Sequence, residues 1–208
     1  MCGWPNVTKA DRPDPKVELL VVPVPSGDRY AGRPIYFSDV VVRSASPYRT
    51  FSDLQGSRWA YNEPRSHSGY NLVRYYLSCA GVGEGYFERV VESGSHRRSL
   101  QMILDDRVDG SAIDSTVLDW EMRHHPEIRS EIRIIETLGP SPAPPWDISR
   151  NFSVDVRAAL QNILVNMDKT ERGRAVLAVG HIDRFMTAQD EDYEVIRAMA
   201  RAGQRISL

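Results

Sequence analysis

The stretch that decides the fold is WAYNEPRSHSGYNLVRYYL, residues 59–77. Residues 59–63 have the composition of a short strand, and residues 70–77 have the apolar spacing of a helix. Between them, Ser66 and Ser68 stand in a hydroxyl-rich turn where the helix begins. The first N–H groups of a helix have no internal partner, and the helix dipole adds a partial positive charge there. The turn therefore predicts a seat for an oxyanion, with the serine hydroxyls as further donors. A second interpretation stays open, because Ser is also a common N-cap and needs no ligand in that role.

Composition narrows the class of protein. The chain has 208 residues, 41% of them apolar and 26% charged, with a formal net charge of −2. This balance is typical of an ordinary globular protein, and it offers no basic surface for nucleic acid. No apolar run approaches the ~18 residues of a membrane span, and the first residues carry neither a basic nor an apolar signal region. Two cysteines are too few for a disulfide framework. We therefore expect no nucleic-acid partner, no membrane span and no cofactor, and a cytoplasmic location for the chain as given.

Strand and helix patterns alternate along the chain. This order predicts an α/β protein with a largely parallel sheet. The expected strands are 17–24, 34–43, 59–63, 87–92, 108–114 and 132–138. The expected helices are 50–56, 70–79, 97–107, 116–125 with Ser115 as its cap, 154–167 with Ser153 as its cap, 171–187 and 190–203. An apolar stripe of Val156, Leu160, Ile163, Leu164 and Met167 is expected on the helix 154–167.

Two extended segments, 34–43 and 132–150, bracket a block of alternating strands and helices. This arrangement predicts one lobe inserted into another through two crossings. We expect residues 37–139 to form the inserted lobe two, and residues 1–36 and 140–208 to form what is present of lobe one. Ligands in such folds bind at helix N-termini, in the cleft between lobes.

Five motifs together resemble one known family. They are residues 32–42 (GRPIYFSDVVV), 53–56 (DLQG), 60–63 (AYNE), 66–70 (SHSGY) and 92–96 (ESGSH). These motifs are similar to the phosphonate/phosphate-binding proteins of ABC transporters, which have the two-lobed fold of type II periplasmic binding proteins. The resemblance runs from Cys2 to about Arg201. It implies a non-catalytic protein that closes its two lobes around a small oxyanion and delivers it to a transporter permease.

The resemblance also implies a set of ligand-binding residues. Ser66, His67, Ser68 and Gly69 fall on the family's phosphonate-oxygen site at a helix start, and His96 falls on a second-lobe histidine that faces the cleft. Asp114 falls on the acidic position that receives a ligand amino group. Trp4 and Asn6 fall on a first-lobe loop that helps to close the cleft. From the residues alone, His96 could equally face solvent on a polar turn, and Asp114 could equally cap the next helix.

Two departures from the family pattern affect the expected function. The Cys-Gly-x-Pro motif of the first lobe stands directly after Met1, whereas the family places it well inside the chain. We therefore expect part of lobe one to be missing here, with apolar surface exposed in what is present and a homodimer possible through that edge. We likewise expect the family's export signal to be missing from the chain as given, and an upstream exported N-terminus would place the protein in the periplasm. Pro144, Pro145 and Asp147 depart from the pattern of the second crossing, which weakens the expectation of aminophosphonate specificity.

Two alternatives to transport remain. The chain could be a truncated or repurposed cytoplasmic domain, similar to a binding protein, that acts as a sensor or interaction module without transport. It could also be an enzyme that uses His67 as a base beside Ser66 or Ser68, but adjacent residues in a turn rarely achieve that geometry. His124, His125 and Glu127 could be offered as a metal site, but they stand at the end of a charged helix and are expected to form a solvated face. We expect no enzyme and no metal.

Overall fold

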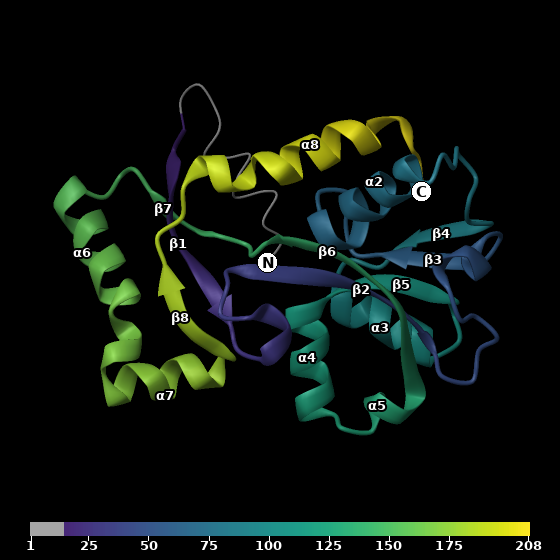
Figure 1. Cartoon of the computed structure of the whole chain (residues 1–208), viewed down its shortest axis with the longest axis horizontal. Coiled ribbons are helices and arrows are strands. Elements are labelled where there is room, and N and C mark those ends of the chain that lie inside the picture. Colours follow the sequence, from purple (N-terminus) through teal and green to yellow (C-terminus); the bar gives the residue numbers. More distant parts are fainter. Residues whose placement is uncertain (1–14) are drawn as a thin grey trace. The chain divides into compact units, whose positions relative to one another are not determined.

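Two strands and one helix carry the chain between two structural units (Figure 1). The computed structural model describes residues 15–208. Unit 1 comprises the chain up to Tyr36 and the segment Ser141–Val195, and unit 2 comprises Phe37–Pro140 and Ile196–Leu208. The crossings fall within β2 (Ile35–Arg43), β6 (Ile132–Pro142) and α8 (Glu194–Ala202).

Unit 2 is built on a five-stranded sheet with strand order β4-β3-β5-β2-β6. Strand β3 pairs in parallel with β4 and β5, whereas β2 pairs antiparallel with β5. Besides β2, β6 and α8, the elements of this unit are β3 (Arg58–Tyr61), α2 (Leu72–Cys79), β4 (Arg89–Glu92), α3 (His96–Leu104), β5 (Gly110–Asp114), α4 (Ser115–His124) and α5 (Ile128–Glu131).

The central strands of unit 2 are buried on both faces of the sheet. Alternate residues of β2 serve the two faces, because successive side chains of a strand point in opposite directions. Val40 and Val42 join a core cluster with α2, whereas Val41 joins a second cluster with α3 and α4. Trp59 and Ala60 of β3 divide in the same way. This double burial explains why the strands are continuous apolar runs rather than alternating ones.

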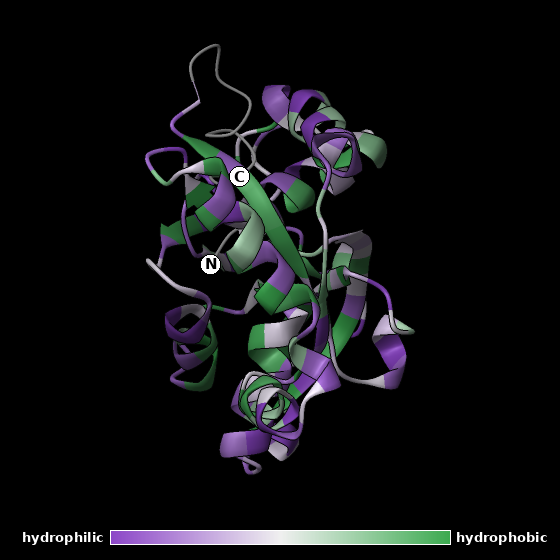
Figure 2. Cartoon of the chain, turned by 90° about the vertical axis from the view of Figure 1, so that its left-hand side faces the viewer, coloured by the Kyte–Doolittle hydropathy of each residue, from purple (hydrophilic) through white to green (hydrophobic). Residues whose placement is uncertain are grey.

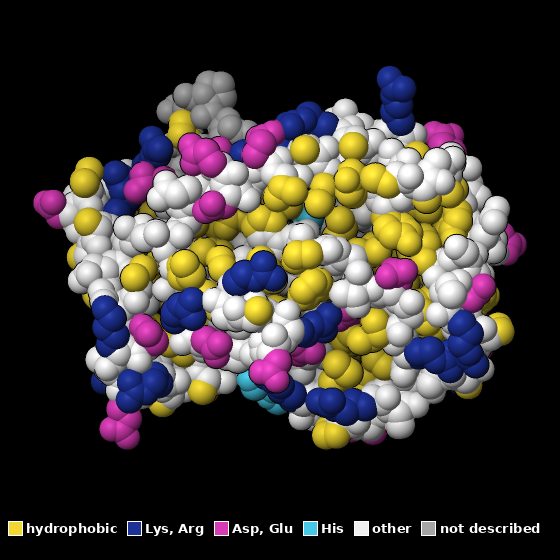
Figure 3. Space-filling view, viewed as in Figure 1, with side chains coloured by type: hydrophobic (Ala, Val, Ile, Leu, Met, Phe, Trp, Pro, Cys, Tyr) yellow, Lys and Arg dark blue, Asp and Glu magenta, His cyan; other side chains and the backbone are white. Residues whose placement is uncertain are grey.

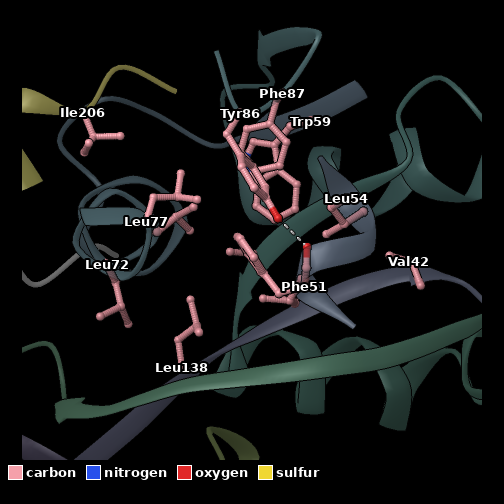
Figure 4. Close-up of a cluster of buried hydrophobic side chains, with 13 residues drawn as sticks. Val42, Phe51, Leu54, Trp59, Leu72, Leu77, Tyr86, Phe87, Leu138 and Ile206 are labelled. Carbon is pink, nitrogen blue, oxygen red and sulfur yellow. Dashed lines mark hydrogen bonds between the residues drawn. The ribbon is translucent and has the colours of Figure 1, made fainter. Parts of the chain in front are cut away.

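An aromatic group fills the larger of these clusters (Figure 4). The ring of Trp59 stacks on Phe87 with centroids 4.5 Å apart, and the ring of Phe51 stacks on Tyr86 at 5.6 Å. The Tyr86 hydroxyl donates to the Phe51 carbonyl at 2.8 Å, so the one polar atom of that ring is satisfied inside the core. The cluster also draws Ile206 from the far end of the sequence.

Unit 1 has a smaller sheet with strand order β7-β1-β8. Strand β1 (Val17–Pro25) pairs antiparallel with both β7 (Trp146–Ser149) and β8 (Ile182–Met186). Helices α6 (Val154–Val165) and α7 (Glu171–Val179) complete the unit. One of its clusters of buried residues consists of Leu20, Val21, Ile148, Leu177 and Phe185.

Helix α6 buries none of its residues fully. Val156, Leu160 and Ile163 are 43%, 37% and 61% exposed, although they belong to the predicted apolar stripe. Figure 2 views the chain from the side on which α6 and α7 lie, and hydrophobic residues (green) alternate with hydrophilic ones (purple) along its helices. Hydrophobic side chains reach the surface over these two helices in Figure 3. The predicted exposure of apolar surface in this part of the chain is therefore confirmed for the described residues.

Several predicted elements need correction. Residues 171–187 do not form one helix. Helix α7 ends at Val179, and after Gly180, His181 adopts a left-handed backbone conformation with φ 53°. The residues that follow form β8, which pairs with β1. The prediction of a largely parallel sheet was wrong: the unit-1 sheet is antiparallel, and the unit-2 sheet is mixed because β2 pairs antiparallel with β5. Helix 97–107 ends at Leu104, because Asp106 takes a left-handed conformation with φ 57°.

The C-terminal segment also differs from the expected lobe boundaries. The prediction placed all of 140–208 in lobe one, but contacts group Ile196–Leu208 with unit 2. The Arg74 guanidinium on α2 donates to the carbonyls of Ile206 at 2.5 Å and Gln204 at 2.8 Å. None of the helices within residues 15–208 combines the length and apolar character needed to cross a membrane.

Candidate functional site

Three helices of unit 2 begin directly after three neighbouring strands. A turn at His67–Asn71 leads into α2 after β3, α3 follows β4, and α4 follows β5. Because β4 and β5 both run parallel to β3, the carboxyl ends of the three strands lie at one edge of the sheet. We call this the carboxyl edge of unit 2. Helix starts at such an edge direct unpaired N–H groups and partial positive charge to one region, which suits an anionic ligand.

The first helix start contains a π turn. Ser66 is its N-cap, and the Ser66 hydroxyl oxygen accepts the Gly69 N–H at 3.0 Å. The Ser66 carbonyl accepts the Asn71 N–H at 3.0 Å, an i to i+5 bond, and also the Asn71 side-chain amide at 3.0 Å. The cap interpretation of Ser66 is therefore confirmed, and its role as a ligand donor stays a prediction. Single π turns inside helices occur frequently at functional sites.

Ser68 and His96 join the first two helix starts. The Ser68 Oγ lies 3.1 Å from His96 Nε2, and the ring tautomer decides which of the two atoms donates. The Ser68 carbonyl accepts the Ser38 hydroxyl at 2.8 Å, which ties the turn to β2. His96 is the first residue of α3, where Ser95 caps the helix by accepting the Arg98 N–H at 3.2 Å. The structure thus brings together Ser68 and His96, two residues that the resemblance assigned to one ligand site, and their role in binding a ligand stays a prediction.

Both histidines of the site are neutral near pH 7. Burial lowers the pKa of His67, which is 1% exposed, to about 4. Burial also lowers the pKa of His96 to about 4, although the Ala112 backbone opposes the shift in part. The donors at this edge are therefore hydroxyls, neutral imidazoles and backbone N–H groups. Such groups can hold an oxyanion by hydrogen bonds without a fixed positive charge.

Asp114 caps the third helix. Its Oδ1 accepts the Thr116 N–H at 2.9 Å and the Thr116 hydroxyl at 2.7 Å. Burial raises the pKa of this carboxyl, and the bonds from Thr116 oppose the shift. The cap interpretation of Asp114 is confirmed, and contact with a ligand amino group stays a prediction. The predicted cap Ser115 was wrong: the Ser115 hydroxyl instead accepts the Phe37 N–H at 3.0 Å.

The remaining predicted residues are placed as follows. Gly69 lies in the π turn, and its N–H is already used by Ser66. Trp4 and Asn6 lie outside the described residues. No site role was predicted for Ser38, whose only signal was a polar residue inside an otherwise apolar strand. None was predicted for Asn62 either, which lies buried against Gly69.

His124, His125 and Glu127, considered above as metal ligands, do not converge on one point. His125 Nδ1 lies 3.6 Å from Glu127, whereas the His124 ring stacks on Trp120 at 3.9 Å. Within residues 15–208, no group of three or more His, Cys, Asp or Glu side chains could hold a metal ion. Arg97 is paired with Glu121 at 2.6 Å, so its charge is largely compensated beside the site.

The fold is that of the type II periplasmic binding proteins, to judge from the solved phosphonate-binding structures that it resembles. A family profile described as "ABC transporter, phosphonate, periplasmic substrate-binding protein" matches residues 2–193. The chain belongs to this family of phosphonate-binding proteins, which are substrate-binding transport components rather than enzymes.

Two curated relatives are similar to this chain at low sequence identity. The phosphonates-binding periplasmic protein of Escherichia coli is 25% identical over 174 residues, which cover 81% of this chain and 51% of the relative. The probable ABC transporter phosphite binding protein PhnD1 of Prochlorococcus marinus is 22% identical over 172 residues, covering 79% of this chain and 58% of the relative. The chain thus spans between one half and three fifths of the length of these relatives.

Solved structures agree on the fold. A binding protein component of an ABC phosphonate transporter from Pseudomonas aeruginosa superposes with a TM-score of 0.80 at 19% identity, covering 91% of this chain and 63% of that one. PhnD1 from Prochlorococcus marinus in complex with methylphosphonate gives a TM-score of 0.74 at 19% identity, covering 90% and 72%. At this level of identity the likeness establishes the fold alone.

Proposed function

We propose that unit 2 binds a small oxyanion of the phosphonate, phosphite or phosphate type at its carboxyl edge, as the substrate-binding component of an ABC transporter. One observation carries the proposal: the contact between Ser68 Oγ and His96 Nε2 joins the starts of two helices at that edge. The names of the relatives, one phosphite-binding and one phosphonates-binding, support this class of ligand. Closure of two lobes around the ligand and delivery to a permease are further parts of the proposal.

The proposed site is selective for oxygen-rich anions rather than for high charge. Its histidines are neutral near pH 7, and hydroxyls supply the remaining side-chain donors. An oxyanion with several acceptor oxygens can accept from two helix starts and from Ser68 at once. A spherical anion such as chloride offers no such set of directed acceptors.

Ligand binding is tested by titrating the chain with phosphate, phosphite, methylphosphonate, aminoethylphosphonate and sulfate, using calorimetry and thermal unfolding. We expect saturable binding of one of the phosphorus oxyanions and a higher melting temperature, because only native-state binding raises the midpoint. Ser68→Ala should weaken that binding ~10-fold or more, the value of a hydrogen bond to a charged group. Ser130→Ala is the matched control, since the Ser130 hydroxyl is exposed on α5 and donates locally to the Glu127 carbonyl. Absence of binding by every anion would refute the proposal.

We also propose that the chain is not catalytic. Ser68 and His96 are the pair that nucleophilic chemistry would use at this site. A histidine with a pKa of about 4 is a weak general base at neutral pH, so the pair is poorly suited to activate the serine. Incubation with the bound oxyanion and with phosphate esters should give no turnover above a Ser68→Ala control.

A sensor or interaction module without transport is the second candidate function. The observation that favours it is the exposed apolar surface of α6 and α7 in unit 1, which suits contact with another protein. Binding to the purified permease of a phosphonate transporter would separate the two candidates, since only a transport component should engage it. The two candidates also predict different locations, since a transport component works in the periplasm and a sensor in the cytoplasm.

A further inference from the structure

Gly69 occupies the tightest point of the carboxyl edge. A Cβ atom placed on this residue would lie 2.0 Å from Asn62 Oδ1, 3.0 Å from Asn62 Cγ and 3.1 Å from His96 Cε1. Real Cβ atoms do not approach other heavy atoms to 2.0 Å, so any larger residue must displace the Asn62 side chain. Contact at 3.1 Å also requires His96 to move by a few tenths of an ångström. Gly69 is therefore the place where the π turn, the end of β3 and the start of α3 meet.

The requirement for glycine is a matter of size. Gly69 does not belong to the glycines with positive φ, and it lies within a right-handed helical turn. An alanine could adopt this backbone conformation without strain. The nearest atoms that limit this space belong to the side chains of Asn62 and His96, and Asn62 is the nearer of the two.

Asn62 is also connected to the segment that carries His96. It is 5% exposed, and its carbonyl accepts the Gly94 N–H at 2.8 Å. The preceding carbonyl, that of Tyr61, accepts both the N–H and the hydroxyl of Ser93. These bonds fix the loop 93–95 to the end of β3, immediately before His96 begins α3. Asn62 thus contacts the π turn through its side chain and the loop before α3 through its backbone.

We propose that Asn62 and Gly69 are positioning residues, which set His96 against Ser68 by close packing in the unliganded protein. The inference rests on the proposed function for its consequence, oxyanion affinity, but the packing itself is a property of the protein without ligand. Gly69 has no side chain and so leaves space for its neighbours, and the Asn62 side chain occupies that space. Together they hold the Ser68 Oγ to His96 Nε2 contact that joins the two helix starts.

The first test needs no ligand. The chain has five histidines, so the Cε1–H signal of His96 can be resolved by NMR and assigned by its disappearance in His96→Gln. Gly69→Ala should shift this signal and the pH at which it titrates, because the new methyl group contacts Cε1. Gly83→Ala is the matched control, since a Cβ at Gly83 meets nothing within 4 Å and its φ is not positive. An unchanged His96 signal in Gly69→Ala would overturn the proposal, whether or not the protein binds any anion.

The second test is a double-mutant cycle between Asn62→Ala and Gly69→Ala. Asn62→Ala removes the atoms at 2.0 and 3.0 Å, so it should make room for the methyl group of Gly69→Ala. We expect Gly69→Ala to weaken binding of the oxyanion ~10-fold or more, and the double variant to bind more tightly than Gly69→Ala alone. Additive losses in the double variant would overturn the proposal, because Asn62 would then act independently of Gly69.

Folding of the variants is itself informative. If Gly69→Ala does not fold and the double variant does, the rescue supports the close packing directly. If neither folds while Asn62→Ala does, Asn62 does not limit the space at Gly69 and the proposal is wrong. If the wild type binds none of the anions, the proposed function fails, and the NMR comparison still decides whether Gly69 and Asn62 position His96.

Discussion

Unit 2 and unit 1 obey the same local rules of secondary structure but differ in how well they bury their apolar residues. In unit 2 both faces of a five-stranded sheet are covered, and two clusters of buried residues include most of the central strands. In unit 1 a three-stranded sheet carries a smaller cluster of five buried residues. Val154, Ile163, Val176 and Val179 of its helices are 69%, 61%, 54% and 78% exposed.

This difference shows that a helix can be well specified locally without having a complete core to pack on. Ser153 caps α6 by accepting the Val156 N–H at 3.4 Å, and Thr170 caps α7 by accepting the Gly173 N–H at 3.0 Å. Such caps depend only on neighbouring residues. Stability of a domain comes mainly from tertiary burial, so the two units should respond differently to the same kinds of substitution.

The largest difference is expected for removal of a large aromatic side chain. Trp59 of unit 2 is fully buried and stacks on Phe87. Trp59→Ala should lower the free energy of unfolding by ~3–5 kcal/mol, the usual cost of such a cavity. Phe152→Ala in unit 1 is the matched variant, and because Phe152 is 51% exposed its effect should stay within ~0.5 kcal/mol. Urea denaturation followed by circular dichroism measures both, and equal losses would contradict the comparison.

The pH dependence of stability should come next in size and belong to unit 2. The pKa of His67 is about 4 in the folded protein, below its ordinary value of 6.5, so the fold favours the neutral ring. As pH falls from 6.5 to 4, the unfolded chain takes up a proton that the folded one does not. His67 alone should therefore lower the free energy of unfolding by about 3 kcal/mol across this window, and His96, whose pKa is also lowered to about 4, should add to the fall.

The raised pKa of Asp114 acts in the opposite direction, because protonation of that buried carboxyl relieves a cost. The contribution of His67 is therefore read as a difference between wild type and His67→Gln, each denatured in urea at pH 7 and pH 4. A His67→Gln variant with the same pH dependence as the wild type would show that His67 is not the group responsible.

Unit 1 should be weakened by a change at one tight position. A Cβ at Gly173 would lie 1.8 Å from the Met167 carbonyl oxygen and 2.8 Å from the Thr170 hydroxyl. Gly173→Ala should cost ~1–3 kcal/mol through this overlap, despite the higher helix propensity of alanine. Gly83→Ala, which meets nothing within 4 Å, serves as the control in unit 2. Hydrogen exchange should locate the loss of protection in α7 and β8 if the damage is confined to unit 1.

The smallest effect on stability is expected on the exposed apolar surface. Ile163→Lys and Val179→Lys should each change the free energy of unfolding by less than ~0.5 kcal/mol, since both side chains are mostly exposed. Charge at these positions should reduce self-association, which exposed apolar surface promotes. Sedimentation velocity over a range of concentrations checks this, and unchanged association would assign any dimer to another surface.

Sequence patterns predicted the elements that have local signals. Residues 51–54 form a short helical turn within the expected helix 50–56, and Ser153 caps α6 as expected. The pattern failed where distant partners decide the structure. Residues 182–186 form a strand because β1 pairs with them, and the sequence of this segment alone does not indicate that pairing.

The candidate site was predictable to a similar degree. The Ser66–Ser68 turn was identifiable from its position between a strand and a helix, and the resemblance to a family added His96. The contact between Ser68 and His96 could not be predicted from local sequence, because it depends on the parallel pairing of β3 with β4. The close approach of Asn62 to Gly69 left no periodic signal at all, since it depends on the packing of side chains across a turn.

The route of the chain through α8 has a consequence for folding during synthesis. Ile206 belongs to the aromatic core of unit 2, and it follows the whole of Ser141–Val195, which belongs to unit 1. A ribosome therefore makes most of unit 1 before it supplies the residue that closes the core of unit 2. The two units therefore cannot complete their folding one after the other in the order of the sequence. Until Ile206 is in place, the apolar surface that it covers in this core stays exposed, and such transient exposure favours aggregation.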